Sequence, residues 1–209
     1  MEPSVIPCAE PDPPETTVCL MACSPHADGS SDAAARILEQ ALASRGVVAD
    51  HVRLRDWKVH PCIGCGHCVA HSGACVFDGD DAQELFRRIG RSDALLLTVP
   101  VYFYGPPALL KGFIDRAQSL WAARPQAGTA AVRDARVALL AARTRGEKLF
   151  EANLLILRCF LDTLGFGLRD PLLLRGVEGP SDIFLPQTIA QLERLGLEAA
   201  EQAIRFHHE

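Results

Sequence analysis

The chain alternates between short apolar runs and helical repeats, and this alternation limits its possible folds more than any other feature. The runs at 17–23 and 94–99 are continuously apolar, as is typical of strands buried on both faces of a parallel sheet. Apolar side chains at helical spacing follow, as in 32–44. Because right-handed crossovers place helices on both faces of such a sheet, the sequence predicts an α/β, three-layer fold with a five-stranded parallel sheet. We expect strands at 17–23, 47–54, 94–99, 137–142 and 168–174, and helices at 32–44, 80–89, 108–121, 148–164 and 189–206.

Residues 1–16 differ in composition from the rest of the chain. They contain five prolines among acidic residues, with neither a basic start nor an apolar segment, so we expect no secretory signal here. We expect this arm to be disordered or loosely packed. Residues 17–209 suit a single domain, since hydrophobic residues make up 48% of the chain. A cysteine-rich loop at 55–80 interrupts the alternation.

Charge and hydropathy predict neither a nucleic-acid nor a membrane partner. The net charge is −5, and the 21 Lys and Arg residues are scattered along the chain. The apolar stretches at 94–99 and 154–164 are far shorter than a membrane span. Eight cysteines without a secretory signal are expected to be reduced thiols or metal ligands. We therefore expect a cytoplasmic protein.

Four of the cysteines form a C-x2-C-x2-C-x6-C pattern. Glycines within it would let the backbone turn tightly enough for the sulfurs to converge on one centre. A compact triplet favours a cubane 4Fe–4S cluster, for which thiolates are the usual ligands. Zinc is an alternative, with His67 or His71 replacing a thiolate, and so is a loop of free thiols that binds nothing. The candidate metal ligands are Cys62, Cys65, Cys68 and Cys75.

The loop after the first predicted strand is rich in hydroxyl groups and leads into a helix N-terminus. Backbone N–H groups and the positive end of the helix dipole favour an anion there. Ser24, Ser30 and Ser31 could add hydroxyl donors to a phosphate. The position has neither the G-x-x-x-x-G-K-[ST] nor the G-x-G-x-x-G motif, which excludes an ATP P-loop and the dinucleotide fingerprint. An ordinary helix cap by Ser30 or Ser31 is the alternative.

Adjacent aromatic residues follow the third predicted strand. Tyr102, Phe103 and Tyr104 lie among turn residues at a strand end, where a flat conjugated ring such as a flavin could bind. Covering the core or forming a subunit interface are the alternatives. Residues 143–147, after the fourth predicted strand, would offer polar and backbone groups to the same ring.

Three segments, in this order, resemble one known family. They are 23–31, the P-C-I-G-C-G-H-C-x6-C loop followed by Asp80 and Asp81, and 99–116. Together they resemble the NAD(P)H-dependent FMN reductase branch of the flavodoxin-like fold, and within it the iron–sulfur flavoproteins. The resemblance runs from residue 17 to residue 176. It implies the flavodoxin-like strand order 2-1-3-4-5.

The resemblance also implies an FMN site, residue by residue. The family usually has arginine at the position of His26 and asparagine at that of Ser30, so phosphate affinity should depend more on backbone donors and hydroxyls. Asp115 and Arg116 are expected to be structural. The implied site consists of a phosphate loop (Ser24, His26, Asp28, Gly29, Ser30 and Ser31), a border of the isoalloxazine ring (Pro100, Val101, Tyr102, Phe103, Tyr104 and Gly105) and a second ring edge (Thr144, Arg145 and Gly146).

The function implied is that of an NAD(P)H-dependent oxidoreductase. Electrons would pass from reduced nicotinamide through FMN, with or without a 4Fe–4S cluster, to a quinone, a flavin, another small acceptor or a redox protein. The flavin carries this chemistry, so we expect no catalytic side chain. The resemblance also implies a homodimer or homotetramer. Two other functions stay open, a non-enzymatic FMN/Fe–S electron carrier and a regulatory module that holds zinc.

Overall fold

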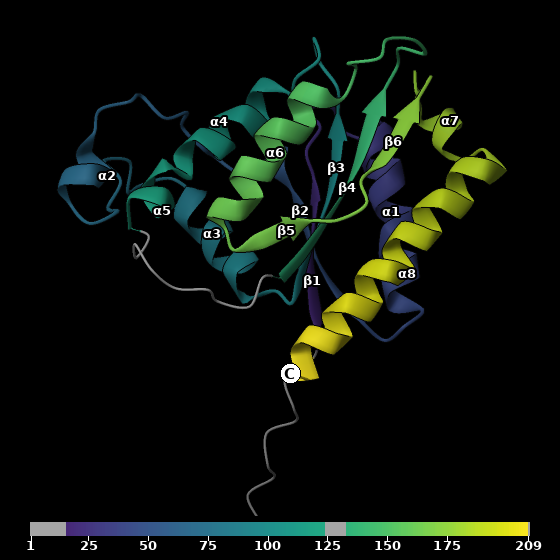
Figure 1. The fold of residues 1–209 in the computed structure, drawn as a ribbon, viewed down its shortest axis with the longest axis horizontal. Helices are drawn as coiled ribbons and strands as arrows, with labels where there is room; N and C mark the ends of the chain where they lie inside the picture. Colours follow the sequence, from purple (N-terminus) through teal and green to yellow (C-terminus); the bar gives the residue numbers. More distant parts are fainter. Residues whose placement is uncertain (1–15, 124–132, 209) are drawn as a thin grey trace, which may run out of the picture.

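A parallel sheet forms the centre of the molecule, as the computed structural model of residues 16–123 and 133–208 shows (Figure 1). Strand β1 (Thr17–Ala22) pairs on one side with β2 (Val48–Arg53) and on the other with β3 (Ala94–Pro100). Next come β4 (Arg133–Ala141) and β5 (Phe166–Leu168). The order β2-β1-β3-β4-β5 is that of the flavodoxin-like fold, which confirms the predicted topology.

The prediction of one fifth strand at 168–174 is wrong in detail, because two short strands occupy this part of the sheet. Strand β5 pairs with the beginning of β4, and β6 (Leu172–Arg175) pairs with its end. Asp170 between them has a φ of 31°, and Pro171 has no N–H to donate to the ladder. The sheet therefore has six strands along the described residues.

Helices cover both faces of the sheet (Figure 1). One face carries α1, α7 and α8, and the other carries α3, α4 and α6. Alternate side chains of β1 supply the two cores: Cys19 and Met21 pack on the α6 side, Val18 and Leu20 on the α8 side. The helices are α1 (Ser30–Ala43), α2 (His67–Ala70), α3 (Ala82–Arg91), α4 (Ala108–Arg116), α5 (Gln118–Ala123), α6 (Glu151–Thr163), α7 (Pro180–Ile183) and α8 (Pro186–His208), with a 3₁₀ turn η1 (Leu54–Asp56).

Several predicted boundaries change. The helix expected at 108–121 is divided between α4 and α5, since the Ala117 N–H donates to Ile114 O in a tighter turn at 3.0 Å. The strand expected at 137–142 begins earlier, because Arg133 and Asp134 already belong to β4. Most of the arm expected at 1–16, and residues 124–132, lie outside the described residues. Across the described ranges, no helix is long and apolar enough to span a membrane.

Candidate functional site

The loops that follow β1 and β3 meet at the carboxyl end of the sheet and line one cavity of about 300 Å³. This is the place where ligands bind in open parallel sheets. Its walls are Ser24, His26, Gly29, Ser30 and Ser31 from the first loop, Pro100, Val101 and Tyr102 from the second, Leu140 and Ala142 at the end of β4, and Val177, Glu178, Gly179 and Pro180 after β6.

The phosphate loop (residues 24–31) ends at the first turn of α1. Gly29 is the N-cap, and the N–H groups of the first helical turn have no intrahelical partner in any α-helix. Ser24 is buried, and its Oγ accepts the His26 N–H at 3.1 Å. Ser31 is 1% exposed, yet its Oγ has no hydrogen-bond partner within the described residues. A buried, unpaired hydroxyl beside a helix N-terminus is chemically suited to a phosphate.

The aromatic loop forms a tight turn over residues 102–105. Tyr102 N–H donates to Gly105 O at 2.8 Å, and Gly105 N–H donates to Tyr102 O at 2.9 Å. Phe103 and Tyr104 have φ values of 48° and 66°, a region that residues with a side chain rarely adopt. Tyr102 lines the cavity, whereas Phe103 projects fully into solvent. The turn thus separates one cavity-lining ring from one exposed ring.

Tyr104 does not line the cavity, and its contacts come from residues that were not predicted to hold it. Its hydroxyl accepts a hydrogen bond from Arg143 NH1 at 2.7 Å. Its carbonyl accepts one from Asn153 Nδ2 at 3.1 Å, and Asn153 is completely buried. An asparagine inside an amphipathic helix pattern gives no local signal for this contact, which spans 49 residues.

Residues 144–146, predicted to form the second ring edge, lie beside the cavity without lining it. Gly146 O accepts a hydrogen bond from Arg175 NH2 at 2.9 Å, and a Cβ at Gly146 would lie 3.5 Å from the Tyr104 hydroxyl. Asp28, Phe103, Tyr104 and Gly105 also lie outside the lining.

Residues 177–180, which were not predicted as site residues, line the cavity instead. They follow β6, and the Val177 N–H donates to Ala141 O at 2.9 Å, so the segment begins beside the end of β4. The rule that ligands bind beyond the carboxyl ends of parallel strands could have identified this segment from the sequence.

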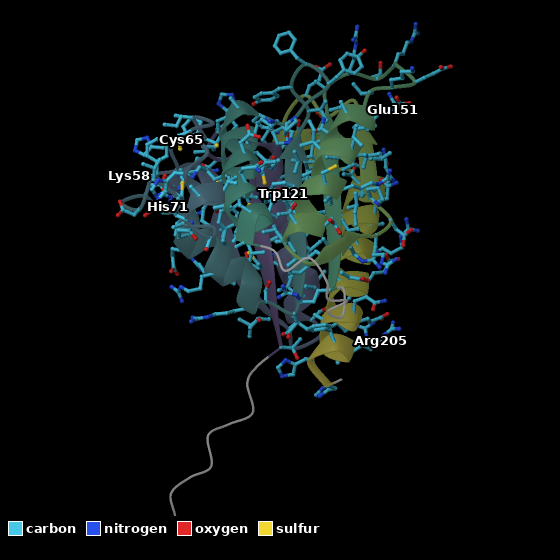
Figure 2. The ribbon with its side chains drawn as sticks, turned by 60° about the vertical axis from the view of Figure 1, so that its left-hand side comes forward. Lys58, Cys65, His71, Trp121, Glu151 and Arg205 are labelled. Carbon is cyan, nitrogen blue, oxygen red and sulfur yellow. The ribbon has the colours of Figure 1, made fainter. Side chains whose placement is uncertain are left out.

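The cysteine loop projects from the side of the domain, where Figure 2 shows Cys65 and His71 on one lobe. Its base is fixed by buried Arg116 on α4, which pairs with Asp80 and donates to His60 O and Phe77 O, each at 3.0 Å. Asp80 also accepts the His60 N–H at 2.8 Å. Arg116 thus has the structural role that the resemblance implies.

All four loop cysteines line a second cavity, of about 410 Å³. Cys62 and Cys65 are exposed, and Cys68 and Cys75 are half-buried. Gly73, with a φ of 91°, allows the loop to approach α5, because a Cβ there would lie 2.5 Å from Ala123 Cβ. Four thiols around one cavity suit a cluster with thiolate ligands. Within the described ranges, however, no three His, Cys, Asp or Glu side chains converge on a position for a single metal ion.

The remaining described cysteines differ from those of the loop. Burial, the largest cause, raises the pKa of Cys19 to about 12, and burial also raises the pKa of Cys23. Both side chains are therefore protonated core residues. Cys159 is exposed but lies on α6, outside the cysteine loop.

Comparison with known proteins identifies relatives of this chain. An iron–sulfur flavoprotein of Methanocaldococcus jannaschii is 34% identical over 97 residues, which are 46% of this chain and 49% of that protein. An iron–sulfur flavoprotein of Archaeoglobus fulgidus is 40% identical over 86 residues, 40% of this chain and 38% of that protein. The matches therefore span half or less of these relatives.

A solved structure and a family model extend the comparison. The NAD(P)H:quinone oxidoreductase from Methanothermobacter marburgensis has the same fold, with a TM-score of 0.69 at 20% identity, over 88% of this chain and 96% of that one. The model of NADPH-dependent FMN reductases matches residues 16–153, which include the phosphate loop, the cysteine loop and the aromatic turn. The chain belongs to the NADPH-dependent FMN reductase family.

Proposed function

We propose that this protein binds FMN at the carboxyl end of the sheet and acts as an NAD(P)H-dependent oxidoreductase, with a quinone, a flavin or another small molecule as the electron acceptor. The observation that carries the proposal is the buried Ser31 hydroxyl, which has no partner among the described residues and lies at the N-terminus of α1 in the same cavity as Tyr102. Family membership supports this cofactor and this class of reaction.

The phosphate loop would bind the anionic end of the cofactor. Backbone N–H groups of the first turn of α1 and the hydroxyls of Ser24, Ser30 and Ser31 would donate hydrogen bonds to the phosphate. His26, Asp28 and Gly29 would shape the loop around it. A loop that protein contacts already hold loses little conformational entropy on binding, which favours tight retention.

Side chains at the ends of β3 and β4 would position the ring. Pro100, Val101 and Tyr102 form an apolar wall at the cavity, and residues 103–105 and 144–146 would border it from outside. When bound, FMN supplies the redox chemistry, taking hydride from NADH or NADPH and passing electrons to the acceptor. The chain's contribution is to orient the ring and to exclude water from one of its sides.

We also propose that Cys62, Cys65, Cys68 and Cys75 hold a 4Fe–4S cluster. Four thiols lining one cavity and the relatives' designation as iron–sulfur flavoproteins support this ligand set. The cluster would add one-electron transfer to the flavin chemistry. The thiols would act as thiolates, so cluster assembly releases protons.

A homodimer or homotetramer in the cytoplasm completes the proposal. The groove between α5 and α6 exposes apolar Trp121 (59%) and Leu155 (64%), which a second copy would cover. Sedimentation analysis tests this part, and a monomer at micromolar concentration would contradict it.

The experiment that tests the function is an anaerobic visible spectrum before and after addition of NADH or NADPH, with FMN, iron and zinc measured on the same sample. Flavin bands that bleach rapidly with reduced nicotinamide are expected, together with iron in the cysteine loop. Flavin that bleaches only with a protein reductant would support the electron carrier instead. A colourless protein that contains zinc and takes up no FMN would overturn the proposal in favour of a regulatory module.

A further inference from the structure

We propose that Arg55 and Asp32 are positioning residues that hold the phosphate loop in the shape required to bind phosphate. This inference rests on the proposed FMN function and adds to it the pair that makes the site selective for a phosphorylated flavin. Neither residue lines the cavity, so their effect must pass through the loop.

The two side chains form a forked ion pair beneath the loop. Asp32 is the third residue of α1 and is 5% exposed. Arg55 follows β2 in the 3₁₀ turn η1, and its side chain is 14% exposed. Arg55 NH1 donates to Asp32 Oδ1 at 2.9 Å and Arg55 NH2 lies 2.9 Å from Asp32 Oδ2. Two parallel bonds fix the orientation of both groups, as a single contact would not.

The same pair holds the loop at two backbone positions. Arg55 NH1 also donates to His26 O at 3.3 Å. Asp32 Oδ2 accepts the Asp28 N–H at 2.7 Å. Asp28 has a φ of 53°, a conformation that is costly for a residue with a side chain and that persists where surrounding contacts impose it. Asp32 supplies such a contact.

Charge gives the pair a second effect at this site. A carboxylate in the first turn of α1 would repel a phosphate at the same helix N-terminus. Arg55 neutralises that carboxylate. The pKa of Arg55 is raised, and the hydrogen bond to Asp32 is the largest cause of this shift. Residues 24–31 contain no Lys or Arg, so the contact with His26 O also brings a positive charge, that of Arg55, to the loop.

Titrations with FMN and with riboflavin separate positioning of the phosphate loop from a general loss of structure. Riboflavin has the same ring and ribityl chain but no phosphate. Arg55→Gln should weaken FMN binding about 30-fold, the equivalent of one hydrogen-bonded charge, and change riboflavin binding by less than about threefold. The conservative Arg55→Lys keeps the charge but loses the two-bond contact with Asp32, so FMN affinity should fall by only about fivefold.

Two further variants sharpen the test. In Arg55→Gln/Asp32→Asn, both charges are removed and the repulsive carboxylate is gone, so part of the lost FMN affinity should return. Arg88→Gln is the matched control: Arg88 makes a similar forked pair with Asp50 of β2, with Nε at 2.9 Å from Oδ2, and neither residue lines the cavity. Neither flavin should bind differently to this control.

The outcomes are distinguishable from failure of the proposed function. If the wild-type protein binds no FMN, the function itself is wrong. If the wild type binds FMN and the ratio of FMN to riboflavin affinity is unchanged in both Arg55→Gln and Arg55→Lys, the positioning role is wrong. An equal loss for both flavins in the folded Arg55→Lys variant would also overturn it, because a purely structural role predicts that result.

Discussion

The phosphate loop and the cysteine loop differ in how much of each is fixed by protein contacts alone. In the phosphate loop, Ser24 and Ser31 are buried, and Asp32 and Arg55 hold the backbone from below. In the cysteine loop, the buried Arg116–Asp80 pair holds the base, while Cys62 and Cys65 are exposed. We infer that the phosphate site is already formed before FMN binds, whereas the four cysteines would be brought together only when a cluster binds.

The largest expected effect is the loss of the cluster when one ligand is removed. After anaerobic reconstitution with iron and sulfide, Cys65→Ser should lose its bound iron and the broad visible absorption, while the flavin bands remain. Cys159→Ser is the control, since Cys159 is exposed but lies on α6. Equal iron content in the two variants would remove the proposed ligand role of Cys65.

Breaking the Arg116–Asp80 pair at the base of the cysteine loop should have the next largest effect, a loss of folding stability. Arg116→Leu leaves the Asp80 carboxylate without its buried partner and should lower the free energy of unfolding by about 3–5 kcal/mol. Urea denaturation measures this change. Lys111→Gln breaks the exposed Lys111–Asp115 pair and should cost about 0.5 kcal/mol or less. Similar losses of stability in both variants would show that the Arg116–Asp80 pair does not anchor the cysteine loop.

Removing two hydroxyls from the phosphate loop should lower FMN affinity strongly and folding stability only slightly. Ser24→Ala combined with Ser31→Ala should weaken FMN binding by about 10- to 100-fold, because two buried hydroxyl donors disappear. The free energy of unfolding should fall by only about 1 kcal/mol, because Ser24 loses the hydrogen bond that its Oγ accepts from the His26 N–H, whereas the Ser31 hydroxyl has no partner among the described residues.

A buried serine elsewhere gives the matched control. Ser92 Oγ donates to Ile89 O at 2.8 Å at the end of α3, so Ser92→Ala should reduce stability by about 1 kcal/mol and leave FMN affinity unchanged. An unchanged FMN titration in the double serine variant would refute the phosphate assignment.

The smallest effect concerns pH and the base of the cysteine loop. Burial opposes ionisation of Asp80, but hydrogen bonds from Arg116 and from the His60 and Ala82 N–H groups together lower its pKa. A carboxylate whose pKa is lower in the folded than in the unfolded protein stabilises the fold at pH values above the unfolded-state pKa of about 3.9. This stabilisation is lost as the pH falls through the folded-state pKa.

Denaturation at a series of pH values tests this sign. Asp80→Asn should lose stability less steeply than the wild type as pH falls from about 5 to about 2. Asp115→Asn, in an exposed pair, should keep the wild-type slope. If stability fell with pH as steeply in Asp80→Asn as in the wild type, the lowered pKa of Asp80 would be contradicted.

The sequence predicted the architecture because its signals are local. The apolar run at 94–99 became β3, and the hydroxyl-rich loop at 24–31 lies at the N-terminus of α1. The strand order 2-1-3-4-5 came from the resemblance and is confirmed. The division of the fifth strand depends on Asp170 and Pro171, which form a turn signal between the apolar residues Leu168 and Leu172.

The parts of the site that were missed depend on contacts between distant residues. Arg55 reaches Asp32 across 23 residues, and Asn153 reaches Tyr104 across 49. Neither contact has a periodic or spacing signal, because side-chain pairs of this kind are set by how the elements pack. Residues 177–180 differ, because they follow β6, whereas the predicted site residues all follow the first, third or fourth predicted strand.

The most direct test of the account is a fluorescence titration of the flavin-free protein with FMN and, in parallel, with riboflavin. We predict one FMN per chain with a Kd of about 1 μM or tighter, and riboflavin binding at least about 100-fold weaker, because the phosphate loop supplies most of the selectivity. Equal affinities for the two flavins, or no FMN binding by the folded protein, would contradict the central claim that the loop after β1 is a phosphate site.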